Sequence, residues 1–210
     1  MAVYTRINNS DLSLIEKSFK IGKILSFSGI KKGIENTNYL IRTKNKKIIL
    51  TIFEKRVQKK DLPFFMDLMF GLSRQKIKCP EPIKNKKGKY LFKIKNKTAC
   101  LVSFLEGKDK INLTNKDCYA VGKNAALLHL AARKLSLYRK NSLSVNSWGP
   151  LLNRIDKRIN KLSGDLINIM KNDLFDIKKK WPKSMPNGII HSDLFTDNIF
   201  FYKKKYYGFI

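Results

Sequence analysis

The sequence predicts an α+β protein of two lobes, with an antiparallel sheet and a helix in the first and mainly helices in the second. Three observations predict this fold class. Short apolar runs with the spacing of strands fill much of the first half. They end at the turn Glu106-Gly107, after which apolar residues recur at helical spacing. Near the C-terminus, a polar stretch lies between two further apolar runs. We therefore predict an N-terminal domain, 1–105, and a C-terminal domain, 106–210.

The first domain is predicted to hold most of the sheet. Its apolar runs indicate strands at 24–27, 39–42, 48–53 and 98–105. A short helix is expected before them, at 10–19. A second helix is expected at 61–75, because Pro63 suits a first helical turn. Pro80 and Pro82 then introduce a hairpin that leads into the last strand.

The second domain is predicted to be helical up to a short final hairpin. Helices are expected at 114–132, at one or two places within 151–170, and at 173–181. We expect a loop at 141–150 and a helix break near Ser163-Gly164. Three short strands follow, at 188–190, 199–202 and 206–210, and Lys203 to Lys205 form the turn between the last two.

The polar stretch His191 to Asn198 carries the strongest chemical signal. It lies between the two apolar runs 188–190 and 199–202, so its side chains are expected to have fixed positions. Asp193 is a candidate base and Asn198 a candidate oxygen ligand, an arrangement like the loop with which kinases take a hydroxyl proton and hold magnesium. Asp and Asn also cap turns, whatever the function. The spacing His-x-Asp-x-x-x-x-Asn is more restrictive than that and favours phosphoryl transfer.

A glycine-containing connection between the first two strands, 28–38, is a candidate for binding phosphates. Its glycines allow the backbone to approach a phosphate closely, and small polar residues surround them. The candidate nucleotide-binding residues here are Gly29, Gly33, Asn36 and Asn38. The stretch lacks the P-loop pattern, and taken alone an ordinary loop explains it equally well. Its place in a strand-loop-strand unit near the N-terminus favours a lid over nucleotide phosphates.

Three further residues complete the candidate nucleotide site. Thr51 stands in the third strand, where a protein kinase carries its phosphate-binding lysine, so Lys55 or another nearby base would have to supply positive charge. Ser103 and Leu105 lie where the last strand of the first domain meets the expected hinge. Their backbone groups are candidates for hydrogen bonds to an adenine edge.

The net charge of +28, from 44 basic and 16 acidic residues, raises the alternative of a nucleic-acid-binding protein. That alternative predicts tight, salt-sensitive retention of DNA or RNA without any need for Asp193. The lysines are dispersed over nearly every polar segment, and no stacking aromatic motif or recognition helix accompanies them. We therefore expect no nucleic-acid partner and assign most of the charge to solvated faces and turns.

The cysteine spacing and the lengths of the apolar runs indicate in which cellular compartment the chain belongs. Cys79, Cys100 and Cys118 have no Cys-x-x-Cys spacing, and two histidines are too few for a zinc site, so reduced structural thiols are expected. No signal-like segment opens the sequence, and no apolar run approaches the length of a membrane span. We expect a cytoplasmic protein with no membrane partner.

With these patterns assembled, the chain resembles the aminoglycoside phosphotransferase and choline kinase superfamily, whose fold is protein-kinase-like, and within it the homoserine kinase branch. The resemblance runs over essentially the whole sequence. It is carried by residues 1–5, 33–39, 50–51 with 54–56, 61–65, 102–107 and 190–201. The last of these segments is specific for the superfamily, whereas Leu50-Thr51 with Glu54-Lys55-Arg56 and the segment 61–65 indicate the branch.

The resemblance implies transfer of the ATP γ-phosphoryl group to the hydroxyl of L-homoserine, a step toward threonine, with Mg²⁺ as the metal. Asp193 would orient and deprotonate the hydroxyl, Asn198 would bind magnesium, and His191 would brace the loop. Phe195 replaces the catalytic-loop lysine of protein kinases, which argues against a protein substrate. Another small-molecule kinase, acting on choline, methylthioribose or an aminoglycoside, stays an open alternative. The sequence predicts no oligomeric state.

The resemblance also implies groups that these 210 residues do not contain. In the superfamily a magnesium-binding aspartate follows the strand that corresponds to 207–210, and further helices complete the larger lobe. Magnesium in such sites is bridged by carboxylate and nucleotide oxygens, so Asn198 alone would not hold it. We therefore expect an incomplete C-terminal lobe, a chain truncated at its C-terminus and inactive alone. A catalytically dead nucleotide-binding scaffold is the third alternative.

Overall fold

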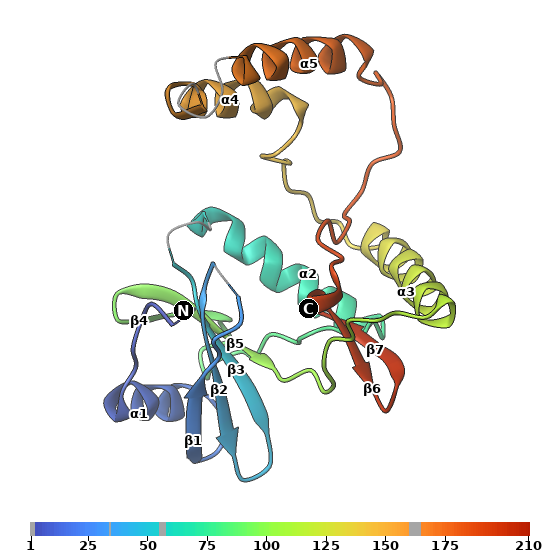
Figure 1. The fold of residues 1–210 in the computed structure, drawn as a ribbon. Helices are drawn as coiled ribbons and strands as arrows, with labels where there is room; N and C mark the ends of the chain where they lie inside the picture. The colour runs from blue at the N-terminus through green and yellow to red at the C-terminus, as the bar shows by residue number, and fades with distance from the viewer. Residues whose placement is uncertain (1–2, 34, 55–57, 160–164) are drawn as a thin grey trace. The chain divides into compact units, whose positions relative to one another are not determined.

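The computed structural model describes residues 3–33, 35–54, 58–159 and 165–210. In this described part the chain divides into two compact units, the first formed by Met1–Leu137 with Gly188–Ile210 and the second by Tyr138–Asn187 (Figure 1). The α+β class, with an antiparallel sheet and accompanying helices, is confirmed. These two units are not the two predicted domains, 1–105 and 106–210, and the predicted boundary at residue 105 stays a prediction.

The first unit is built around an antiparallel sheet of five strands in the order β1-β2-β3-β5-β4 among the described residues. The strands are β1 (Ile24–Gly29), β2 (Thr37–Thr43), β3 (Lys47–Ile52), β4 (Leu91–Ile94) and β5 (Lys97–Ser103). The predicted strands all lie within one to three residues of these bounds. The β-branched residues of β2, β3 and β5 favour strands, which is why the apolar runs predicted these strands.

One face of this sheet, here called the outer face, is closed by the N-terminal helix. Alternate residues of β2 and β3 point to it, so Tyr39, Ile41, Ile48 and Leu50 are buried together. Helix α1 (Asn9–Ser18) covers them with Ile15, which is fully buried. Its first turn is fixed by a capping box in which the side chain of Asn8 and the side chain of Asp11 each accept the other's backbone N–H.

The opposite, inner face is closed only in part. Helix α2 (Leu62–Arg74) places Met66 against Cys100 and Val102 of β5. Toward β2 the same face carries Asn38, Leu40 and Thr51, which are only half-buried. The inner face of β2 and β3 therefore offers a partly open surface next to the glycine loop (residues 30–36, of which 34 lies outside the described residues).

A second core joins the final hairpin to two helices. Strands β6 (Ile199–Tyr202) and β7 (Lys205–Phe209) pair antiparallel. Buried residues of this hairpin pack with α2 and with α3 (Asn115–Arg133): Leu72, Leu128, Ala131, Ala132, Ile199, Phe201 and Phe209. The hairpin is thus held by the same helix that covers the inner face of the sheet. This packing fixes the polar stretch that precedes β6.

The segment after β5 also docks on this hairpin. Lys108 and Phe201 exchange two backbone hydrogen bonds, of 3.1 and 2.9 Å. Gly107 directly before it has φ +106°, and a Cβ at this position would lie 2.6 Å from the carbonyl oxygen of Phe201. Only glycine fits both the conformation and the close approach. At the expected turn Glu106-Gly107, the segment that follows β5 therefore contacts β6.

The β6–β7 turn has an unusual composition. Lys203 and Lys204 have φ of 49° and 62°, and Lys95 and Asn96 in the β4–β5 turn have 46° and 60°. Two consecutive positive φ values match the hairpin turns that favour Asn-Gly. The fold accepts lysine here at some conformational cost.

The second unit is a pair of helices, and it corrects two predictions. Helix α4 (Val145–Ile159) begins inside the predicted loop 141–150 and contains Pro150, because Trp148 donates its indole N–H to the Leu143 carbonyl at 2.9 Å and helps to close the first turn. Helix α5 (Leu166–Lys180) is continuous, so the separate helix predicted at 173–181 is wrong. Ile167, Met170 and Leu174 are spaced along one face of this helix, so the apolar pattern continues through Asp173. The predicted break near Ser163-Gly164 lies outside the described residues.

The strand predicted at 188–190 is also wrong. These residues form no strand, and Ile190 is 60% exposed. An apolar run becomes a strand only where a neighbouring strand pairs with it, and in the described chain none does so here. Among the described residues, the polar stretch is therefore flanked by a strand on its C-terminal side only, where β6 follows it. No helix of the described residues is long and apolar enough to cross a membrane.

The three cysteines are expected to differ strongly in reactivity. Burial raises the pKa of Cys100 to about 12, and burial together with the charge of Glu81 raises that of Cys79 to about 11, whereas Cys118 is exposed on α3. Because the thiolate is the reactive form, iodoacetamide at pH 8 should modify Cys118 alone in the folded protein and all three after unfolding. Mass spectrometry of tryptic peptides checks this. Rapid modification of Cys100 in the native protein would contradict it.

Candidate active site

The polar stretch before β6 brings the two predicted catalytic-loop residues together. The Asn198 amide donates one hydrogen bond to Oδ2 of Asp193 at 2.9 Å and another to the Asp193 carbonyl at 2.8 Å. Ser192, directly before Asp193, has a positive φ of 69°, and a single turn of 3-10 helix, Thr196–Asn198, shapes the chain between Asp193 and Asn198. Within the described residues, Oδ1 of Asn198 accepts no hydrogen bond. That oxygen is therefore left available to a cation.

Asp193 lies on the surface of the first unit. It is exposed, and its Oδ2 accepts the hydrogen bond from Asn198, which fixes the orientation of the carboxylate. A carboxylate held this way can accept a proton from a hydroxyl that approaches from solvent. Its orientation is set by Asn198 rather than by burial.

His191 anchors the start of the loop to the end of β7. Its Nε2 lies 3.0 Å from the Ile210 carbonyl, and its ring lies 5.7 Å from that of Phe209, centroid to centroid. Because a carbonyl only accepts, Nε2 must carry the proton. Ile210 in turn donates its backbone N–H to the Asn198 carbonyl at 3.0 Å. His191 and Asn198 thus hold the same residue, which supports a bracing role for the histidine.

Two predicted nucleotide-binding residues meet on the inner face of the sheet. Asn38 and Thr51 are register partners in β2 and β3. The Thr51 hydroxyl donates to Oδ1 of Asn38 at 2.8 Å. Both are half-buried on the partly open surface beside the glycine loop. A neutral pair therefore stands where a protein kinase carries a lysine, and Lys55, the suggested replacement, lies outside the described residues.

The glycine loop holds the other predicted residues in different ways. Gly33 has φ +104°, which favours glycine. Gly29 instead lacks a side chain because Val3 packs over it: a Cβ there would lie 2.8 Å from the Val3 side chain. Oδ1 of Asn36 accepts the backbone N–H of Glu54 at 3.4 Å. The loop is also tied by an ion pair between Lys32 and Asp109, 2.5 Å apart.

At the predicted hinge, the two candidate residues differ. The Ser103 N–H donates to the Glu81 carbonyl at 2.8 Å, and its hydroxyl accepts the Glu81 N–H at 2.9 Å. The Ser103 N–H is therefore not available to a nucleotide. Leu105 is buried, and its backbone has no hydrogen-bond partner in the part of the chain that the structure describes. Leu105 is the better candidate for an adenine contact.

The segment 107–109 links these groups. Lys108 pairs with Phe201 of β6, three residues beyond the end of the catalytic loop, and Asp109 holds Lys32 of the glycine loop. The hinge, the glycine loop and the hairpin that carries Asn198 therefore converge on three consecutive residues. Sequence reasoning missed Asp109, because a lone carboxylate in a polar segment gives no signal of its partner.

A model of the phosphotransferase enzyme family matches residues 26–210, most of the chain. The chain belongs to this family. The match spans the glycine loop, the hinge and the whole stretch from His191 to Asn198. The resemblance to the superfamily predicted from the sequence is confirmed.

Curated relatives in the family are homoserine kinases. The one from Brucella anthropi is 40% identical over 210 residues, covering 100% of this chain and 64% of the relative. That from Rhizobium etli is 40% identical, covering 100% and 65%, and that from Methylobacterium radiotolerans is 39% identical over 201 residues, covering 96% and 63%. The chain thus spans slightly less than two thirds of the length of these relatives.

Solved structures of family kinases share the fold at low sequence identity. Spectinomycin phosphotransferase in complex with ADP and spectinomycin superposes with a TM-score of 0.67 at 16% identity, covering 98% of this chain and 69% of that one. Choline kinase from Cryptosporidium parvum gives 0.64 at 16% identity, covering 94% and 62%. These likenesses establish the phosphotransferase-family fold.

Proposed function

We propose that this chain forms the larger part of a homoserine kinase, which transfers the γ-phosphoryl group of ATP to the side-chain hydroxyl of L-homoserine in threonine biosynthesis. One observation carries the proposal: Asp193 and Asn198 are joined side chain to side chain on an exposed loop. The family membership and the homoserine kinases at about 40% identity over the whole chain support it.

The residues of the loop divide the work. Asp193 accepts the proton of the substrate hydroxyl as the hydroxyl oxygen attacks the γ-phosphorus of ATP and ADP leaves. During this step the hydrogen bond from Asn198 holds the Asp193 carboxylate in place. His191 fixes the loop to the end of β7, so that the base does not move away from the reacting oxygen. Phosphoryl transfer depends on the positioning of the reacting groups more than on covalent catalysis. Fixing the loop should therefore increase the rate of transfer.

The loop also fits a hard cation such as Mg²⁺. Oδ1 of Asn198 and the carboxylate of Asp193 are oxygen donors of the kind that magnesium prefers, and Oδ1 has no other partner among the described residues. When bound, the metal neutralises charge on the phosphates. The described residues contain no cluster of three or more His, Cys, Asp or Glu side chains, so the two loop residues would hold the metal together with further oxygen ligands.

ATP is proposed to lie on the inner face of the sheet. Asn38 and Thr51 offer polar side chains there, the Leu105 backbone offers an adenine contact, and Gly33 lets the loop approach the phosphates. Lys32, directly before Gly33, is a cationic group of the same loop and pairs with Asp109. A cytoplasmic location follows for an enzyme that uses ATP and a free amino acid.

The direct test measures ATP-dependent phosphorylation in the longest natural form of the protein. We expect turnover with L-homoserine, and at least about a hundredfold lower kcat/KM with choline, spectinomycin or methylthioribose, since each lacks groups that the homoserine site would pair. Preference for one of these compounds would favour the alternative of another small-molecule kinase. No transfer to any acceptor would reject the kinase assignment.

A further inference from the structure

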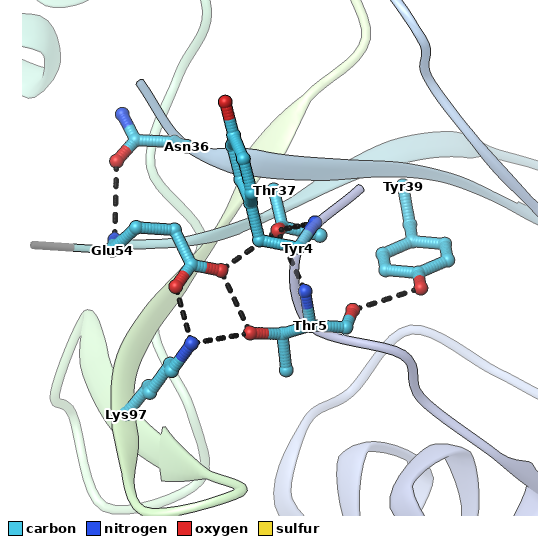
Figure 2. A network of polar contacts seen from close by, with 7 residues as sticks. All are labelled: Tyr4, Thr5, Asn36, Thr37, Tyr39, Glu54 and Lys97. Carbon is cyan, nitrogen blue, oxygen red and sulfur yellow. Dashed lines mark hydrogen bonds and ion pairs between the residues drawn. The ribbon is translucent and has the colours of Figure 1, made fainter. Parts of the chain in front are cut away.

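A buried carboxylate at the end of β3 takes no part in the proposed chemistry. Glu54 follows β3 by two residues, and its side chain is only 10% exposed. One carboxylate oxygen accepts hydrogen bonds from the hydroxyls of Thr5 and Thr37, at 2.7 and 2.8 Å. The other oxygen pairs with the ammonium of Lys97. Figure 2 shows this network, in which four chain segments meet at one side chain.

Thr37 is the centre of the network. Its hydroxyl donates to Glu54 and accepts the backbone N–H groups of Tyr4 and Thr5, at 2.9 and 3.1 Å. One donated and two accepted bonds use the full capacity of a hydroxyl. Thr37 is also fully buried, so each of these bonds replaces one to water. The first residue of β2 is thereby fastened to the N-terminal segment.

Thr5 connects the N-terminal segment to Glu54, Lys97 and Tyr39. Its hydroxyl donates to Glu54 and accepts from Lys97 at 2.7 Å, and its carbonyl accepts the Tyr39 hydroxyl at 2.9 Å. Burial alone would raise the pKa of Glu54, but hydrogen bonds from Lys97, Thr5 and Thr37 outweigh it and hold the pKa below its ordinary value. Glu54 is therefore a charged acceptor at neutral pH.

The backbone of Glu54 extends the network into the glycine loop. Its N–H donates to Oδ1 of Asn36, the last residue of that loop, and Thr37 is the next residue along the chain. The other end of the loop follows β1, where Val3 of the same N-terminal segment packs over Gly29. Both ends of the glycine loop thus rest on the segment that Glu54 holds.

We propose that Glu54 is a positioning residue that sets the conformation of the glycine loop and, through it, the affinity for ATP. The proposal rests on the nucleotide-binding role assigned to that loop under the proposed function. It also relates two segments that carry the family resemblance and are far apart in the sequence: Thr5 of segment 1–5 contacts Glu54 of segment 54–56.

A purely structural role is the rival explanation, and the chain offers a matched control for it. Asp11 is also a nearly buried carboxylate, 11% exposed, and it pairs with Lys95, whose exposure matches that of Lys97. Asp11 caps α1 on the outer face and has no described contact with the glycine loop. Loss of either carboxylate should cost stability, but only Glu54 should affect the loop.

The experiment compares Glu54→Gln with Asp11→Asn in the longest natural form of the protein. In Glu54→Gln the amide N–H group faces either the Lys97 ammonium or the hydroxyls of Thr5 and Thr37, which also donate to Glu54. In both orientations a donor meets a donor, and the network opens. We expect backbone amide exchange in peptides 26–33 and 35–40 to become at least about fivefold faster in Glu54→Gln and to stay unchanged in Asp11→Asn. We also expect KM for ATP to rise about tenfold, with kcat and KM for homoserine within about twofold of wild type.

Thr5→Val provides a milder second variant should Glu54→Gln fold poorly, because it removes one hydroxyl and no charge. It should raise exchange in the same two peptides. Equal exchange in Glu54→Gln and wild type, or equal acceleration in Asp11→Asn, would overturn the proposal. If the wild-type protein transfers no phosphoryl group to homoserine, the proposed function fails, while the exchange comparison still decides whether Glu54 positions the loop.

Discussion

Replacing Asp193 with asparagine should lower kcat for homoserine phosphorylation by at least about a thousandfold. Asparagine has the same shape and can still accept the hydrogen bond from Asn198, so the loop should keep its conformation. What is lost is the ability to take the hydroxyl proton. Steady-state kinetics on the longest natural form, together with ATP binding by calorimetry, measures both effects. The Kd for ATP should stay within about threefold, because the base acts on the acceptor.

Asp197 supplies the matched control for this variant. It is exposed, lies in the same loop and carries the same charge, but it makes no hydrogen bond to Asn198 in the described structure. Asp197→Asn should keep kcat within about threefold of wild type. Equal loss of activity in both variants would show that the charge of the loop matters rather than a base at Asp193. Near-normal turnover in Asp193→Asn would remove Asp193 from the mechanism.

Replacing Gly107 with alanine should have the largest effect on stability. The added Cβ would lie 2.6 Å from the Phe201 carbonyl oxygen, and the residue would also be held at φ +106°. We expect a loss of about 3 kcal/mol in the free energy of unfolding, from backbone strain and steric overlap. For a chain of this length this corresponds to a fall in Tm of roughly 6–12 °C. Thermal unfolding followed by circular dichroism measures it.

Gly122 in α3 is the control for this substitution. A Cβ there meets no atom within 4 Å, and the residue is helical. Gly122→Ala should therefore be neutral or stabilise by about 0.5–1 kcal/mol. Activity should fall in Gly107→Ala even well below its Tm, since the contact joins the hinge to the hairpin that carries the catalytic loop. Unchanged stability would mean that the backbone at Gly107 moves freely, against the close packing described above.

The parts of the fold that the sequence predicted well are those set by local pattern. Short apolar runs at 39–42 and 48–53 indicate β2 and β3 from local sequence alone. The Thr114-Asp117 capping box likewise marked the start of α3. In the candidate site, the spacing of His191, Asp193 and Asn198 was readable because all three lie on one short loop.

The parts that could not be predicted depend on partners distant in sequence. Ile190 was expected in a buried strand, but burial needs a neighbour that the local pattern does not reveal. The start of α4 was missed because Pro150 reads as a helix breaker, whereas a side-chain bond from Trp148 supports the turn before it. No local sequence pattern predicts the ion pair between Glu54 and Lys97, since the two residues lie 43 positions apart.

The lysines at the hairpin tips have a practical consequence. Lys203 and Lys204 occupy backbone conformations that suit asparagine and glycine better, as do Lys95 and Asn96. Neither tip belongs to the catalytic loop His191 to Asn198 or to the proposed nucleotide site, so neither takes part in the proposed chemistry. Replacing each of these residue pairs with Asn-Gly should therefore raise the thermal stability of the protein without changing the residues of the proposed active site.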